Sequence, residues 1–182
     1  MPRCENCKDK FEPKAFNQKY CMVKDECVLA FTNWFKEQKQ KNWKKEKAEK
    51  KKDLMTLQDW IKIAQSNFNT YIRLRDKSLN NPCMSCRKPL GTKYDAGHFY
   101  NANNHWNLRF DERNVHSQCV HCNRHLHGNL LEYRNQLEFY YGVTWLIELE
   151  QDAKKTRKFT IEEVKEINDI YKEKIKQLKN NS

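Results

Sequence analysis

The sequence predicts an α+β fold that is mostly helical, in which a small ββα unit braced by four cysteines lies between long polar helices. Three observations predict it. The cysteines form two quartets. In long segments without Gly or Pro, the apolar residues recur at helical spacing, and only one short region has the pattern of strands. The chain has 182 residues, of which 38% are hydrophobic and 32% charged. We therefore expect small units and long polar helices rather than one large core.

The charge balance indicates a polyanionic partner. Lys and Arg number 35 against 24 Asp and Glu, which gives a net charge of +11. Such an excess is typical of nucleic-acid binding, although a generally solvated surface also produces it. We expect no membrane partner, because no apolar stretch approaches the length of a spanning helix and no basic helix has a continuous apolar face.

Cysteine usage predicts metal binding in a reducing cytoplasm. The N-terminal segment is polar and does not read as a signal peptide. Eight cysteines in a cytoplasmic chain are more typical of metal ligands than of disulfides.

An N-terminal zinc unit is expected over residues 1–30. It contains Cys4-x2-Cys7 and Cys21-x5-Cys27 and too little apolar material to fold alone. Four thiolates around one Zn²⁺ would supply the missing stability.

A basic helical linker is expected over residues 31–55. Between positions 36 and 52 there are nine Lys and three Glu, with no Gly or Pro, so the segment favours a long helix. We favour a solvated linker, and a basic arm lying along a phosphate backbone is a compatible alternative.

Residues 56–150 are expected to form the central domain. A helix over 56–79 begins at Thr56, which can form a cap with Asp59, and Pro82 follows it. Helical spacing returns over 129–150 and is broken at Gly142.

A C-terminal helix is expected within residues 151–182. Thr160 and Glu163 form a capping box, and apolar residues line one stripe over 160–179. The stripe would pack either on the core or on the same helix of a second subunit, so a homodimer is one expectation.

The second cysteine quartet is the strongest metal signal in the chain. Cys83-x2-Cys86 and Cys119-x2-Cys122 are two knuckles separated by 32 residues. Four thiolates complete a tetrahedron around Zn²⁺, and such a closed site is structural rather than catalytic.

Between and after these knuckles, residues 93–100 read as a strand, and a helix is expected to open at Asn123. Strand, turn, strand and helix tied at one end by zinc resemble the ββα-metal, or HNH, nuclease finger in its zinc-braced version.

Phosphodiester hydrolysis needs a base and a divalent cation, and this region offers both. His98 is the candidate base, because a histidine titrates near neutral pH. Asp95 and Asn123 offer oxygen ligands for Mg²⁺, or for Mn²⁺ in its place. Asn114 is expected to orient His98 by a hydrogen bond.

One position departs from the HNH pattern. The metal ligand usually directly precedes the catalytic histidine, and here that position is Gly97. A bulge at Gly97 would draw Asp95 towards the metal, whereas in a regular strand another residue must bind it. His127, four residues after Asn123, is the first substitute, and His116 and His125 are weaker candidates.

Three arginines flank the expected site and are candidates for binding DNA phosphates, although each alone reads equally well as a solvated charge. They are Arg109, Arg113 and Arg124.

The order of these motifs resembles the NinG (Rap) family of lambdoid phages over most of the chain. The resemblance rests on the segments from Asp95 to His98, Leu108 to Phe110, Arg113 to His116, Gln118 to Asn123, His125, Gly128 to Asn129 and Tyr133 to Arg134. It implies a phage recombination endonuclease, acting in the host cytoplasm, that cuts branched double-stranded DNA, including Holliday junctions and D-loops.

By the same resemblance, His98, Asn114 and His116 are the catalytic set. The resemblance also supports Asp95, Asn123 and His125, and it does not clearly support His127, so Asp95 is preferred to His127 as metal ligand.

Two further functions fit the same sequence. One is a non-catalytic zinc protein that binds or shapes DNA, which leaves the set around His98 unexplained. The other is a helical adaptor that joins phage or host recombination proteins through its terminal helices.

Overall fold

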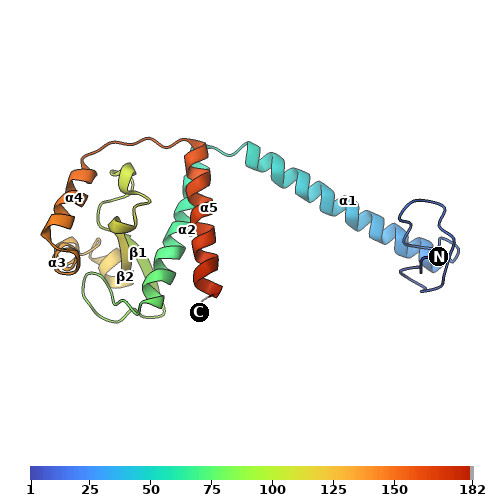
Figure 1. Ribbon diagram of the computed structural model, residues 1–182, viewed down its shortest axis with the longest axis horizontal. Helices are drawn as coiled ribbons and strands as arrows, with labels where there is room; N and C mark the ends of the chain where they lie inside the picture. The colour runs from blue at the N-terminus through green and yellow to red at the C-terminus, as the bar shows by residue number, and fades with distance from the viewer. Residues whose placement is uncertain (181–182) are drawn as a thin grey trace. The chain divides into compact units, whose positions relative to one another are not determined.

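The computed structural model describes residues 1–180 and divides into two compact units, Met1–Met55 and Thr56–Ser182 (Figure 1). Within the described residues, no helix is both long enough and apolar enough to cross a membrane.

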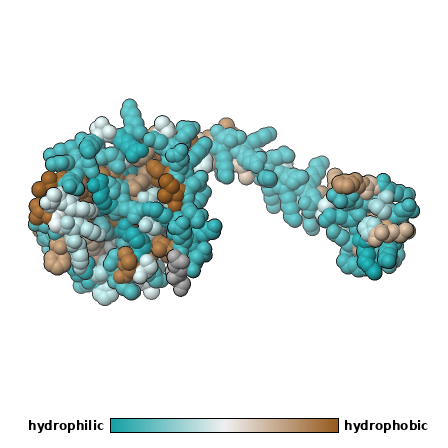
Figure 2. Space-filling view, viewed as in Figure 1, coloured by the Kyte–Doolittle hydropathy of each residue, from teal (hydrophilic) through white to brown (hydrophobic). Residues whose placement is uncertain are grey.

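The N-terminal unit consists of a cysteine-rich segment and the helix α1, Asp25–Asp53. Its small core contains Cys4, Phe11, Tyr20 and Cys27, and the ring of Tyr20 meets that of Phe31 edge-on at 6.1 Å. Cys27 is the one buried residue of α1 among those described, and hydrophilic side chains cover most of the helix surface (Figure 2), although Leu29, Phe35 and Trp43 are exposed on it. The first turns of α1 therefore pack on the cysteine-rich segment, and the lysine run beyond them is exposed to solvent.

Two long helices, α2 (Leu57–Ser78) and α5 (Ile161–Asn180), pack against each other in the second unit. Thr56 caps α2, because its hydroxyl accepts a hydrogen bond from the backbone N–H of Asp59. The rings of Phe68 and Tyr171 meet edge-on at 4.8 Å across the helix pair. The apolar stripe of the C-terminal helix thus packs on the core, and residues 151–182 belong to the same unit as residues 56–150.

A two-stranded antiparallel sheet lies beside α2. Strand β1 (Tyr94–His98) pairs with β2 (Val115–Cys119) in a regular register that places Gly97 opposite His116. No extra residue interrupts the pairing, so the strand has no bulge at Gly97. The segment between the strands contains two short 3-10 turns, η1 (Trp106–Leu108) and η2 (Glu112–Asn114).

A buried ion pair fixes α2 against β2. Asp76 is 2% exposed, accepts a hydrogen bond from the backbone N–H of Ser117 at 2.7 Å, and pairs with Arg75 at 2.9 Å. Arg75 also donates to the backbone carbonyl of Val115 at 3.1 Å. Every charge that this contact buries is therefore partnered.

The helix expected to open at Asn123 is interrupted. A π-helical turn, η3 (His121–His125), follows β2, and then His127, Gly128 and Asn129 all have positive φ. The helix α3 begins only at Leu130 and ends at Tyr141, and Gly142, with φ of +86°, separates it from α4 (Val143–Ala153). The predicted break at Gly142 is confirmed.

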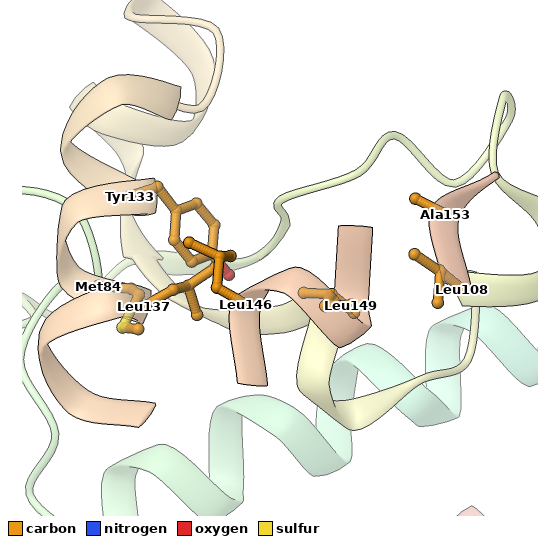
Figure 3. Packing of buried hydrophobic residues seen from close by; sticks show 7 residues of the cluster. All are labelled: Met84, Leu108, Tyr133, Leu137, Leu146, Leu149 and Ala153. Atoms are coloured by element: carbon orange, nitrogen blue, oxygen red, sulfur yellow. The ribbon is translucent and has the colours of Figure 1, made fainter. Parts of the chain in front are cut away.

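Helices α3 and α4 lie on the other side of the sheet from α2 and α5 (Figure 1), and together with Met84 and Leu108 they form a second core cluster (Figure 3). Its buried members are Met84, Leu108, Tyr133, Leu137, Leu146, Leu149 and Ala153. The hydroxyl of Tyr133 donates to the backbone carbonyl of Gly97 at 3.0 Å, so this cluster holds β1 directly.

We predict that Gly97→Ala destabilises the second unit by about 1–3 kcal/mol. A Cβ at this position would overlap the Gln118 side chain, whose Cδ would lie 2.7 Å away. Gln118 is fully buried and donates to the carbonyl of Gly128 at 2.6 Å, so moving its side chain away from the new Cβ would break this buried hydrogen bond. Urea denaturation monitored by fluorescence measures the change.

Gly91→Ala is the matched control, because a Cβ there has no neighbour within 4 Å. It should change the free energy of unfolding by no more than about 0.5 kcal/mol. Equal stability of the two variants would contradict the packing argument at Gly97.

Candidate metal centres and active-site groove

Both cysteine quartets are assembled as metal sites. Within each quartet, the four sulfur atoms lie within 4.8 Å of one another, and all eight cysteines are free thiols. The Sγ atoms of Cys4 and Cys27 are 3.7 Å apart, and those of Cys86 and Cys119 are 3.9 Å apart. A tetrahedral zinc with Zn–S bonds of about 2.3 Å separates its sulfurs by about 3.8 Å, so both quartets could hold Zn²⁺.

Backbone and side-chain donors support the second quartet. The N–H of Cys119 points to the sulfur of Cys83 at 3.3 Å, and the N–H of Cys122 points to the sulfur of Cys119 at 3.4 Å. The side-chain amide of Asn129 lies 3.8 Å from the sulfur of Cys122. Such donors stabilise thiolates, the form of cysteine that binds zinc.

His98 ends β1 and is held in one orientation. Its Nε2 lies 3.0 Å from the backbone carbonyl oxygen of Arg109, and its ring lies 6.3 Å from that of Phe68. Because a carbonyl only accepts, Nε2 carries the proton of this bond and Nδ1 keeps its lone pair. Burial lowers the pKa of His98, which favours the neutral ring that a general base requires.

A groove with a volume of about 480 Å³ opens beside His98, and we call it the His98 groove. Its polar lining includes His98, Asn101, Asn103, Asn123 and His127. His98, Asn123 and His127, which are distant in the sequence, therefore meet at one surface.

Asp95 lies on the opposite side of β1 from His98, as the alternation of the strand requires. Its carboxylate accepts two hydrogen bonds from Arg124, at 2.7 and 2.8 Å, and one from the side-chain amide of Asn123 at 3.1 Å. The contact with Arg124 is the main cause that lowers the pKa of Asp95. Asp95 is thus ionised and already paired.

Among the described residues, the two cysteine quartets are the only groups of three or more His, Cys, Asp or Glu side chains close enough to share a metal ion. Asp95 and the histidines around the His98 groove do not form a third. The alternative in which a bulge at Gly97 brings Asp95 to the metal is not observed, because the register is regular.

Asn114 does not make the expected hydrogen bond to His98. It is fully buried; its Oδ1 accepts from the N–H of Tyr100 at 2.7 Å, and its Nδ2 donates to the carbonyls of Tyr100 and Leu108 at 2.9 and 3.1 Å. These bonds close the segment between the strands, which also carries the Arg109 carbonyl that holds His98. Asn114 therefore positions His98 through the backbone.

His116 lies away from the His98 groove, on β2, and its buried side chain packs against α3. Its Nδ1 and Nε2 each lie 3.1 Å from a tyrosine hydroxyl, of Tyr133 and Tyr141 respectively. Burial lowers its pKa to about 4. The structure does not bring His116 to the groove, and His125 is exposed beside the ring of His121 rather than lining it.

All three candidate arginines have protein partners, but only Arg124 is largely exposed. Arg109 is buried, donates to Gln65 and Asn103, and lies over the ring of Trp106. Arg113 is paired with Asp111 at 2.6 Å and Asp152 at 2.7 Å. These two guanidinium groups are engaged in holding the segment between the strands, whereas the Arg124 side chain is 64% exposed.

A second groove, which we call the basic groove, has a volume of about 610 Å³. Its charged lining consists of Arg73, Lys77, Lys93, Asp95 and Arg124. Sequence reasoning missed Arg73, Lys77 and Lys93. Arg73 and Lys77 share a helix face at i and i+4, but that spacing does not distinguish a groove wall from a solvated face.

We predict that His116 makes the stability of the second unit pH-dependent. Below its ordinary pKa of 6.5, the unfolded chain binds a proton that the folded protein excludes down to about pH 4. The free energy of unfolding should therefore fall by about 2 kcal/mol between pH 7 and pH 5 from this residue alone. Urea denaturation of the wild type and His116→Gln at both pH values measures it.

The His116→Gln variant should lose less stability than the wild type between pH 7 and pH 5. Subtracting the loss of the variant from that of the wild type removes any effect of zinc release that both proteins share. His125→Gln, at an exposed site, is the control and should retain the wild-type dependence. Identical pH slopes for all three proteins would refute the assignment.

Comparisons with known proteins agree over nearly the whole chain. A family model described as the bacteriophage lambda NinG protein matches residues 1–181. The NinG protein of Salmonella phage P22 is 37% identical over 199 residues, covering 97% of this chain and 93% of that protein. The NinG proteins of Escherichia phages lambda and 933W are each 36% identical, covering 98% of this chain and 93% and 94% of theirs.

No solved structure matches the chain. Family membership therefore rests on the sequence, over a length that includes both cysteine quartets and the residues of both grooves. The chain belongs to the NinG family.

Proposed function

We propose that this protein is a metal-dependent endonuclease that cuts branched DNA, with His98 as the general base. The observation that carries the proposal is the His98 groove. A neutral histidine, fixed through Nε2 by a backbone carbonyl, there meets the side chains of Asn123 and His127. The choice of branched DNA, including Holliday junctions and D-loops, rests on the resemblance described above.

In the proposed reaction, Nδ1 of His98 takes a proton from a water molecule as that water attacks the phosphorus and the bond from phosphorus to the leaving oxygen breaks. The leaving oxygen takes a proton from solvent. The Arg109 carbonyl keeps the ring oriented and stabilises the imidazolium that results, because it accepts from Nε2–H. A bound Mg²⁺ or Mn²⁺ would neutralise charge on the phosphate and on the leaving oxygen.

Asn123 is the proposed first ligand of that cation. Its Nδ2 donates to Asp95, which directs its Oδ1, a hard oxygen donor, away from Asp95. Asp95 would complete the site after release from Arg124, and His127, which lines the His98 groove, is the alternative.

A second candidate function is a zinc protein that binds branched DNA without cutting it. The observation that favours it is the engagement of Asp95 by Arg124, which leaves no preassembled carboxylate ligand beside His98.

We predict that His98→Ala abolishes cleavage of a labelled four-way junction in Mg²⁺ or Mn²⁺, with a loss of about 10²–10⁴-fold because the base is removed. Gel analysis of strand scission, beside a linear duplex of matched length, measures it. His121→Ala is the control, since His121 is exposed and lies outside the His98 groove.

A zinc-loaded His98→Ala protein that still cuts would eliminate His98 as the base. If the wild type binds the junction but does not cut it in the presence of any divalent cation tested, the enzyme proposal fails and the non-catalytic function replaces it.

We also predict two zinc ions per chain, with separable effects. Cys7→Ser should reduce the content to one and leave unfolding of the second unit unchanged, because the two quartets lie in different units. Cys119→Ser should also reduce it to one but lower the melting temperature of the second unit, because zinc binding contributes folding free energy. Elemental analysis and calorimetry measure both.

Zinc content that stays at two in either variant would contradict the quartet assignment. An unchanged melting temperature in Cys119→Ser would contradict the structural role of the second quartet.

A further inference from the structure

We propose that the basic groove binds the phosphate backbone of the DNA strand whose scissile bond enters the His98 groove. The inference deepens the proposed function, on which it rests, by giving the substrate a path across the protein.

The charge of the groove supports an anionic ligand. It is lined by four cationic side chains and one carboxylate, a net charge of +3. Arg124 is paired with that carboxylate, Asp95. Arg73 donates to the hydroxyl of Thr70. Within the described part of the chain, Arg73, Lys77 and Lys93 form no ion pair with a carboxylate. Arg73, Lys77 and Lys93 thus face the groove without an ion-pair partner among the described residues, and Asp95, on which Arg73 acts only at longer range, is the one carboxylate in the lining.

The arrangement of these charges suits a chain of phosphates better than a single small anion. Arg73 and Lys77 lie one turn apart on α2, about 6 Å along the helix axis. Lys93 immediately precedes β1, and Arg124 lies on η3 across the groove. Cations therefore come from three separate segments around one open volume of about 610 Å³.

The basic groove adjoins the His98 groove. Asp95 and Arg124 line the former and Asn123 lines the latter, and the side chains of Asn123 and Asp95 are hydrogen-bonded at 3.1 Å. A backbone bound along Arg73 and Lys77 can therefore continue past Arg124 to His98. A phosphate that attracts Arg124 would also weaken the hold of Arg124 on Asp95, the carboxylate proposed to complete the metal site.

The test measures binding without cleavage, in the His98→Ala background, by fluorescence anisotropy with a labelled four-way junction and a linear duplex over a range of KCl concentrations. The groove variant carries Arg73→Gln, Lys77→Gln and Lys93→Gln. The matched control carries Lys62→Gln, Lys154→Gln and Lys158→Gln, which remove the same charge from exposed positions outside the groove.

The groove variant should bind both DNAs at least tenfold more weakly, and its slope of log K against log salt should be smaller by about two to three. The control should stay within about twofold of the parent, with an unchanged slope. Lys93→Gln alone, outside any helix or strand, should lower the slope by about one and serves if the triple variant does not fold.

Equal binding by the groove and control variants would overturn the proposal, even if the wild type cuts DNA. If the groove variant loses binding while the wild type never cuts, the phosphate site stands and the endonuclease proposal fails. Zinc content and melting temperature equal to those of the parent establish that each variant is folded.

Discussion

The tie between the second cysteine quartet and the two-stranded sheet is the constraint on which the rest of the second unit depends. A pair of five-residue strands is marginal in water without further support. Here the knuckle Cys83–Cys86 lies at the end of β2, where its sulfurs lie close enough to those of Cys119 and Cys122 to share a metal ion, and the backbone N–H of Met84 donates to the carbonyl of Ser117 at 2.9 Å. With α2 on one face and Tyr133 on the other, the pair becomes rigid enough to hold His98 at its end.

The same sheet determines what the segment between its strands can do. Asn114 bonds to Tyr100 and Leu108 from inside, while Arg113 pairs with Asp111 and Asp152 at its outer side. These contacts fix the carbonyl of Arg109, and that carbonyl fixes the ring of His98. Asn114, Arg113 and Arg109 were candidates for catalysis or DNA binding in the sequence. In the structure, they instead hold His98 in position.

Local patterns in the sequence predicted much of this fold. The spacing of the cysteines predicted both quartets. The capping residues predicted the start of α2, and Gly142 predicted the break between α3 and α4. The partners of polar side chains were not predictable, because they depend on which distant segments meet. Asn114 was expected at His98 and bonds to backbone instead, and Lys93 reads as an ordinary surface lysine until α2 is placed beside it.

The sequence identified Asp95 as a candidate oxygen ligand near His98, but it did not show which way the carboxylate points. The strand is regular, so Asp95 points away from His98 and pairs with Arg124. The Arg124 side chain is 64% exposed but that of Asp95 is only 18% exposed, and the two form a bidentate pair at 2.7 and 2.8 Å, which is a strong arrangement of charge-assisted hydrogen bonds. Asn123 lines the His98 groove and donates a hydrogen bond to Asp95, so it connects the two faces of β1 on which His98 and Asp95 lie. Asp95 would therefore become available to another ligand only when a competing anion, such as a DNA phosphate, draws Arg124 away.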